Sequence, residues 1–176
     1  IGLVRNFEQK GVEEVMEAED QLDTYEDKLG SYLVLLSSKD LTEAYSRRAA
    51  ELLRDIGDFE RIGDHAMNIM ESAQAMQDKR ASFSPEGQKE VDTLAGALEE
   101  VLSMTVNAFA TNDSSLALRV EPLEQVVDDL VFEIRKNHIH RLQTGICTIE
   151  LGFILSDLLT NMERISDHCS NTAGTL

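Results

Sequence analysis

Acidic side chains spaced four residues apart are the best candidates for chemistry in this 176-residue sequence. Glu60 and Asp64 form one such pair. Because residues at i and i+4 lie on the same face of a helix, their carboxylates would stand side by side. Two neighbouring carboxylates repel each other, and a hard cation with oxygen ligands is the usual counter-charge. The pair is therefore a candidate set of cation ligands.

The same pair returns in the second half of the sequence inside a longer repeated motif. The nine residues at 60–68 read ERIGDHAMN, and those at 163–171 read ERISDHCSN. Six of the nine are identical, at a spacing of 103 positions. A sequence with 33 acidic residues contains many isolated pairs, most of them solvated. A pair repeated with its neighbours preserved favours a cation site over such a chance spacing.

A weaker repeat, at a spacing of 105 positions, adds a second acidic pair to each half. If that pair lies on the preceding helix of an antiparallel hairpin, it comes alongside the motif. Counting back from the turn gives an offset of about two residues, or ~3 Å, in the second half, and about one turn in the first. We therefore expect two clusters of four carboxylates. The first consists of Glu19, Asp23, Glu60 and Asp64, and the second of Glu124, Asp128, Glu163 and Asp167.

Other chemistries find little support in the sequence. His65 and His168 each follow an aspartate by one position and point ~100° away around the helix. We therefore expect them to support the metal ligands or to lie at the helix surface, and not to bind the cation themselves. The Glu-x-x-His spacing of a di-iron bundle is missing, as are a glycine-rich phosphate loop and a Cys/His zinc framework. We expect no enzymatic activity, since no nucleophile arrangement is recognisable.

Composition indicates a helical, acidic protein. Hydrophobic residues make up 42% of the chain and aromatic residues 5%, with only 10 glycines and 2 prolines. The formal charge of −17 argues against nucleic acid and anionic lipid as partners, and indicates either binding of cations or a basic partner, or simple solubility. No apolar run reaches the ~18–20 residues of a membrane span. Two cysteines without a Cys-x-x-Cys pair favour a reducing, cytoplasmic compartment.

Few helix breakers interrupt the chain, and their positions predict an all-α fold of tandem helical bundles. Pro122 should cause a kink or a fresh helix start between 118 and 123. The expected helices span roughly 5–37, 41–79, 85–111, 114–143 and 146–173. The repeat divides them into a first unit at 1–80 and a second, three-helix unit at 84–176. By comparison with the second unit, we expect the first to lack its opening helix and to leave apolar residues exposed or covered by a second copy.

The residues at 58–66, DFERIGDHA, resemble the signature of the PhoU family, helical regulators of bacterial phosphate uptake. That family has two three-helix units in tandem, each with Glu/Asp-x-x-x-Asp motifs that bind clusters of iron or zinc. The resemblance covers nearly the whole chain. It implies that Glu60, Asp64, Glu163 and Asp167 bind metal, and, by a weaker match, Glu19, Asp23, Glu124 and Asp128. Other divalent cations would also suit oxygen ligands.

The sequence HCSN at 168–171 is most similar to the PhoU-like domain at the cytoplasmic end of bacterial sodium/phosphate cotransporters. This implies a cytoplasmic protein, associated with the membrane through a transporter, with that transporter's membrane portion or a phosphate-signalling protein as partner; a homodimer is a further expectation. Two functions stay open. One is a metal-binding regulatory domain of phosphate transport, either part of a cotransporter or a regulator of uptake. The other is a helical protein-interaction module without a functional metal.

Overall fold

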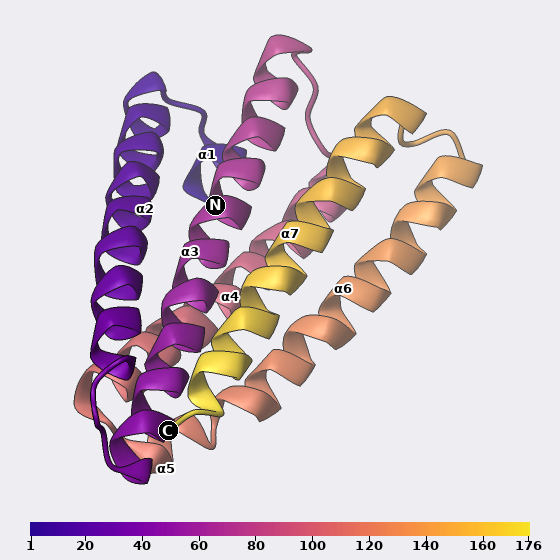
Figure 1. Ribbon diagram of the computed structural model, residues 1–176. Helices are drawn as coiled ribbons and strands as arrows, with labels where there is room; N and C mark the ends of the chain where they lie inside the picture. The colour runs from indigo at the N-terminus through magenta and orange to yellow at the C-terminus, as the bar shows by residue number, and fades with distance from the viewer.

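The computed structural model describes residues 1–176 and contains helices but no strands, which confirms the predicted all-α class. Figure 1 shows α2 at one edge, α6 at the other, and α3 and α7 between them, while α4 runs behind these helices. No helix has a segment both apolar and long enough to span a bilayer. The helices are α1 (Gly2–Arg5), α2 (Gln9–Ser37), α3 (Glu43–Asp78), α4 (Pro85–Thr111), α5 (Ser114–Ala117), α6 (Val120–Gln143) and α7 (Ile149–Ala173).

Local capping signals set several helix starts. The Ser84 hydroxyl accepts a hydrogen bond from the Gly87 amide at 3.2 Å, and Pro85 occupies the first position of α4. Helix α3 begins at Glu43 and not at 41, because the Thr42 hydroxyl caps it by accepting from the Tyr45 amide. Helix α7 begins at Ile149 and not at 146, because Thr148 caps it in the same way.

A fresh helix start lies just before Pro122, as predicted. Helix α5 ends at Ala117 and α6 begins afresh at Val120, so Pro122 lies in the first turn of α6. A proline in the first turn loses nothing by lacking an amide hydrogen, because the amides of that turn have no partner within the helix. The ladder therefore restarts instead of passing through the proline.

The predicted first helix, at 5–37, is wrong at its start. Helix α1 ends at Arg5, and the chain turns through extended conformations at Asn6 (φ −141°) and Glu8 (φ −134°) before α2 begins. The Arg5 guanidinium lies 2.6 Å from the Asp92 carboxylate of α4, which fixes α1 against the second half of the molecule. No proline or glycine between 5 and 9 announces this break in the sequence.

The core lies mainly in the second half of the chain. Helices α4, α6 and α7 form a three-helix bundle, and their side chains include the largest fully buried ones, such as Leu94, Leu98 and Leu158. Helix α3 joins this core through Ile69 and Ala73 and packs most extensively along α7. The core is thus continuous across the predicted boundary between 1–80 and 84–176, and the division into these two units stays a prediction.

Helix α2 packs mainly on α3 and buries little. Its buried residues are Val12 and Leu33, whereas Tyr25, Leu29 and Tyr32 are exposed along one face. The exposure of apolar residues in the first unit is the arrangement that the repeat predicts. The hairpin of α2 and α3 nevertheless presents its acidic pairs on facing helices, as the hairpin of α6 and α7 does.

Candidate metal centres

Three of the four acidic residues predicted for the second cluster converge. Glu124 and Asp128 of α6 and Asp167 of α7 each offer a carboxylate oxygen, and these oxygens lie within 4.8 Å of one another. An ion that binds oxygens at ~2.0–2.6 Å can bridge two oxygen atoms separated by about twice that distance. All three residues are half-buried, and Oδ1 of Asp128 is buried without a hydrogen-bond partner. The three side chains therefore fit an oxygen-coordinated cation.

The fourth residue, Glu163, pairs with an arginine. Its Oε2 atom lies 2.9 Å from Nη2 of Arg135, and the same nitrogen donates to the Thr160 hydroxyl at 3.1 Å. Glu163 is still close enough to act electrostatically on Asp128. Sequence reasoning missed Arg135, although its position seven residues after Asp128 places both on one face of α6.

The second cluster is electrostatically strained as a set of anions. Burial, followed by the charges of Asp128 and Asp167, raises the pKa of Glu124. Burial, followed by the charges of Glu163 and Asp167, raises the pKa of Asp128. Arg164 gives partial relief, since its Nη1 atom lies 3.2 Å from Oδ2 of Asp167 on the exposed side. A bound cation would relieve the repulsion more directly.

The first cluster lies on one side of the α2–α3 hairpin but is looser. Desolvation and the charges of Asp23 and, more weakly, Asp64 raise the pKa of Glu19. Desolvation and the charges of Asp64 and Asp23 also raise the pKa of Glu60, while Arg61 opposes this shift. The four carboxylates thus act on one another across two helices. No three of them bring ligand atoms within 4.8 Å of one another, in contrast to the second cluster.

The glycine of the motif lets α2 approach α3. A Cβ atom added to Gly63 would lie 2.9 Å from Cδ1 of Leu22 and 3.9 Å from Cγ of Glu19. The close approach therefore lies between Glu60 and Asp64, where the carboxylates of the two helices face each other. In the second motif the equivalent residue is Ser166, which is fully buried and whose hydroxyl has no partner.

The motif histidines serve the interface between α3 and α7. The rings of His65 and His168 stack with centroids 5.6 Å apart and planes inclined by 24°. Nδ1 of His168 lies 2.8 Å from Oδ1 of Asp58, and Nδ1 of His65 lies 2.8 Å from Oδ1 of Asn161. Each motif therefore has two faces: the carboxylates face the hairpin partner, and the histidines join the two halves of the molecule.

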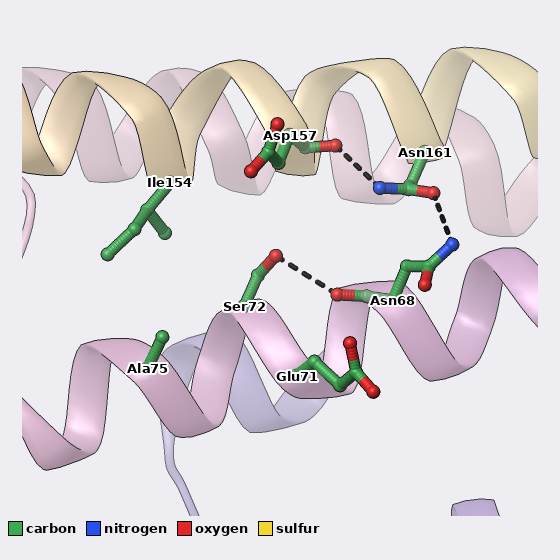
Figure 2. Close-up of a pocket in the computed structure, with 7 residues that line it drawn as sticks. All are labelled: Asn68, Glu71, Ser72, Ala75, Ile154, Asp157 and Asn161. Carbon is green, nitrogen blue, oxygen red and sulfur yellow. Dashed lines mark hydrogen bonds between the residues drawn. The ribbon is translucent and has the colours of Figure 1, made fainter.

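An open cleft of ≈ 310 Å³ lies beside this histidine pair, between α3 and α7. Figure 2 shows the amide of Asn68 bonded to Asn161 at its edge, with Nδ2 3.0 Å from Oδ1. The other polar side chains along the cleft include Glu71 and Asp157 from opposite walls. It offers no basic group to an anion such as phosphate.

A duplicated, all-helical protein with an acidic pair on each arm of two hairpins is the class that fold and site define. The chain belongs to the PhoU family, since the model of the PhoU domain matches residues 2–73 and 91–176. This confirms the resemblance drawn from the motif. The finer similarity to the cotransporter domain stays a prediction.

Individual relatives share a quarter or more of the aligned residues. The phosphate-specific transport system accessory protein PhoU homolog 1 of Thermotoga maritima is 29% identical over 68% of this chain and 51% of its own length. The Pseudomonas aeruginosa PhoU homolog is 25% identical over 92% of this chain and 66% of its own. The chain thus spans about half to two thirds of these relatives.

Two further similarities bear on architecture. The putative inorganic phosphate export protein YjbB of Escherichia coli K12 is 26% identical over 93% of this chain, which amounts to 30% of that longer protein. The crystal structure of PhoU from Pseudomonas aeruginosa superposes with a TM-score of 0.85 at 24% identity, covering 93% of this chain and 78% of that one. This likeness establishes the tandem helical-bundle fold.

Proposed function

We propose that this chain is a regulatory domain of phosphate transport whose acidic clusters bind divalent metal ions. Its curated PhoU relatives are named accessory proteins of phosphate-specific transport systems, which supports the regulatory part. The convergence of Glu124, Asp128 and Asp167 within 4.8 Å carries the metal-binding part. Neither part requires an enzymatic reaction.

The ligand chemistry limits the choice of ion. In the second cluster Glu124, Asp128 and Asp167 would hold the ion, and Glu163 could join them by leaving Arg135. In the first cluster the ligands would be Glu19, Asp23, Glu60 and Asp64. Oxygen-only sets of this kind suit hard divalent cations, and the family resemblance favours iron or zinc. A bound cation supplies positive charge between facing helices, so the carboxylates of each hairpin would draw its two helices together.

Two placements of such a domain are supported by different relatives. The named PhoU accessory proteins support a separate cytoplasmic regulator that acts on a transport or phosphate-signalling protein. YjbB, in which the matching region is 30% of the whole, supports a domain joined to a membrane transporter. In either placement the net charge of −17 favours a basic surface on the partner. A second copy of the chain is a further partner to test.

Elemental analysis tests the metal-binding part. Protein purified without chelator and supplied with iron, zinc or manganese should retain metal, whereas the double variant Glu124→Gln/Asp167→Asn should lose that of the second cluster. Asp129→Asn is the matched control, because Asp129 is an exposed carboxylate adjacent to Asp128 in sequence and lies outside the converging group. Equal metal content in all three proteins would refute the second site. An absence of metal from all of them would favour the interaction module without a functional metal.

A further inference from the structure

The two acidic clusters differ at one basic position. Arg135 extends from α6 to Glu163, the fourth carboxylate of the second cluster, with 2.9 Å between Nη2 and Oε2. The repeat spacing of 105 positions that relates Glu19 to Glu124 places Gly30 at the corresponding position of α2. The first cluster has no counterpart of Arg135, since Gly30 has no side chain with which to reach Glu60.

The Arg135 guanidinium is held against α7 by two contacts. The same nitrogen that contacts Glu163 also donates to the Thr160 hydroxyl of α7 at 3.1 Å. Thr160 and Glu163 are one turn apart on α7, so Arg135 is bound to two groups on the facing helix. Both ion-pair partners are partly buried, with side-chain exposures of 42% for Arg135 and 30% for Glu163. Glu163 stays outside the group formed by Glu124, Asp128 and Asp167.

We propose that Arg135 lowers the metal affinity of the second cluster, because its ion pair with Glu163 keeps that carboxylate from binding an ion together with Glu124, Asp128 and Asp167. The inference rests on the proposed metal-binding function. While Arg135 is paired, the cluster offers three carboxylates and a positive neighbour to an incoming ion. Removal of the guanidinium releases the fourth carboxylate and deletes a repelling charge. Arg135 therefore weakens metal binding at this cluster and stabilises the hairpin of α6 and α7 when no metal is bound.

Substitution of Arg135 should thus change affinity and stability in opposite directions. Arg135→Gln should bind Mn²⁺ or Zn²⁺ about tenfold more tightly in calorimetric titration, the scale of one charge interaction near a protein surface. Its melting temperature in chelator should fall below that of the parent. All proteins would carry Glu60→Gln and Asp64→Asn, so that the heat reports on the second cluster. Circular dichroism would verify that the helices are intact.

Lys136→Gln is the matched control. Lys136 is the next residue and carries the same charge, but it pairs with Glu133 of its own helix at 3.0 Å and lies outside the cluster. Lys136→Gln changes the net charge by the same amount as Arg135→Gln. Because Lys136 lies outside the cluster, we expect the metal affinity of this variant to equal that of the parent. Arg135→Lys, which keeps the charge but not the planar fork, should give an intermediate affinity. Adding Glu163→Gln to Arg135→Gln should abolish most of the gain, because the gain requires the released carboxylate.

Each outcome of this set has one meaning. Tighter binding by Arg135→Gln alone, lost again with Glu163→Gln, supports the inference. If the parent binds metal and Arg135→Gln binds it equally or more weakly, the inference is overturned and the metal-binding function stands. Equal gains in Arg135→Gln and Lys136→Gln overturn it too, because net charge would then suffice. Titrations without heat in the parent and in every variant, with no metal retained on desalting, overturn both the inference and the metal-binding function.

Discussion

Nδ1 of His168 lies 2.8 Å from Oδ1 of Asp58, so the last helix is bonded to the middle of α3 across 110 positions of sequence. The repeat spacing of 103 positions converts this pair into His65 and Asn161, which are also 2.8 Å apart. In one contact the histidine comes from α7 and its partner from α3, and in the other the histidine comes from α3 and its partner from α7. The two histidine rings stack between these contacts. Each copy of the motif thus contributes a histidine to the contact between the two copies, as well as two carboxylates to an acidic cluster.

The two reciprocal contacts should differ in their effect on stability. Asp58 is only 7% exposed, so Asp58→Ala would leave the Nδ1–H group of His168 without its acceptor and should lower the free energy of unfolding by about 1–3 kcal/mol. Asn161→Ala should cost less, because Asn161 and its second partner Asn68 are more exposed. Urea denaturation of both variants would measure the difference.

Asp58→Asn is the control for this comparison. It restores to the first copy the residue found at the equivalent position of the second, and its amide oxygen can still accept from His168. We expect a smaller loss than for Asp58→Ala. An equal loss in the two Asp58 variants would show that the charge, and not the acceptor, stabilises the interface.

The close approach at Gly63 gives a second prediction. Gly63→Ala would place a methyl group 2.9 Å from Cδ1 of Leu22, so α2 must shift or Leu22 must change rotamer. Because Cδ1 is the end of a flexible, half-buried side chain, we expect the clash to offset the gain that alanine brings through helix propensity. Urea denaturation would measure this, and we also expect less metal bound at the first cluster. Gly57→Ala on the same helix is the matched control, because nothing lies within 4 Å of its added Cβ. That control should gain about 0.5–1 kcal/mol from helix propensity. A Gly63→Ala protein stabilised as much as Gly57→Ala would contradict the close approach.

Much of this architecture could be predicted from local signals. The cap at Ser84 and the restart at Pro122 depend on residues within one turn, and so does the pairing of Glu60 with Asp64. The break after Arg5 could not be predicted, because no helix breaker stands there and the contact of Arg5 is with Asp92, 87 positions away. The same holds for the contact between Asp58 and His168. Helix periodicity shows which residues share a face, but it does not show which second helix that face meets.

The raised carboxyl pKa values predict how stability changes with pH. Glu124 and Asp128 titrate above their ordinary values of 4.5 and 3.8, so between the ordinary and raised pKa values the folded state binds more protons than the unfolded chain. The stability of the metal-free protein should therefore fall as pH rises through this window. Glu124→Gln/Asp128→Asn should flatten that fall, as measured by urea denaturation in chelator between pH 4 and 8.

His138 has the opposite influence, which makes the comparison with the variant necessary. Burial lowers its pKa from 6.5, so the folded state binds fewer protons than the unfolded chain and stability is lost as pH falls through about 6.5. The contribution of His138 is the same in the parent and in the variant, so it cancels when their stabilities are subtracted. A difference that does not change with pH would show that the two carboxylates are not perturbed.

Removal of one aspartate from each cluster is the broadest test of the two sites. Asp64→Ala/Asp167→Ala should lower metal content while the helical circular dichroism stays unchanged, because both residues lie at the helix surface. In chelator its melting temperature should rise slightly, since like-charge repulsion at i, i+4 is removed from both motifs. Arg164 loses its partner Asp167, but an ion pair with an exposed arginine contributes only about 0–1 kcal/mol. Asp27→Ala, at an exposed position of α2, corrects for the higher helix propensity of alanine. Addition of metal should then raise the melting temperature of the parent and of Asp27→Ala, but not that of the double variant, because only an ion bound to the folded state stabilises it. An equal response of all three proteins to metal would place the binding groups elsewhere in the chain.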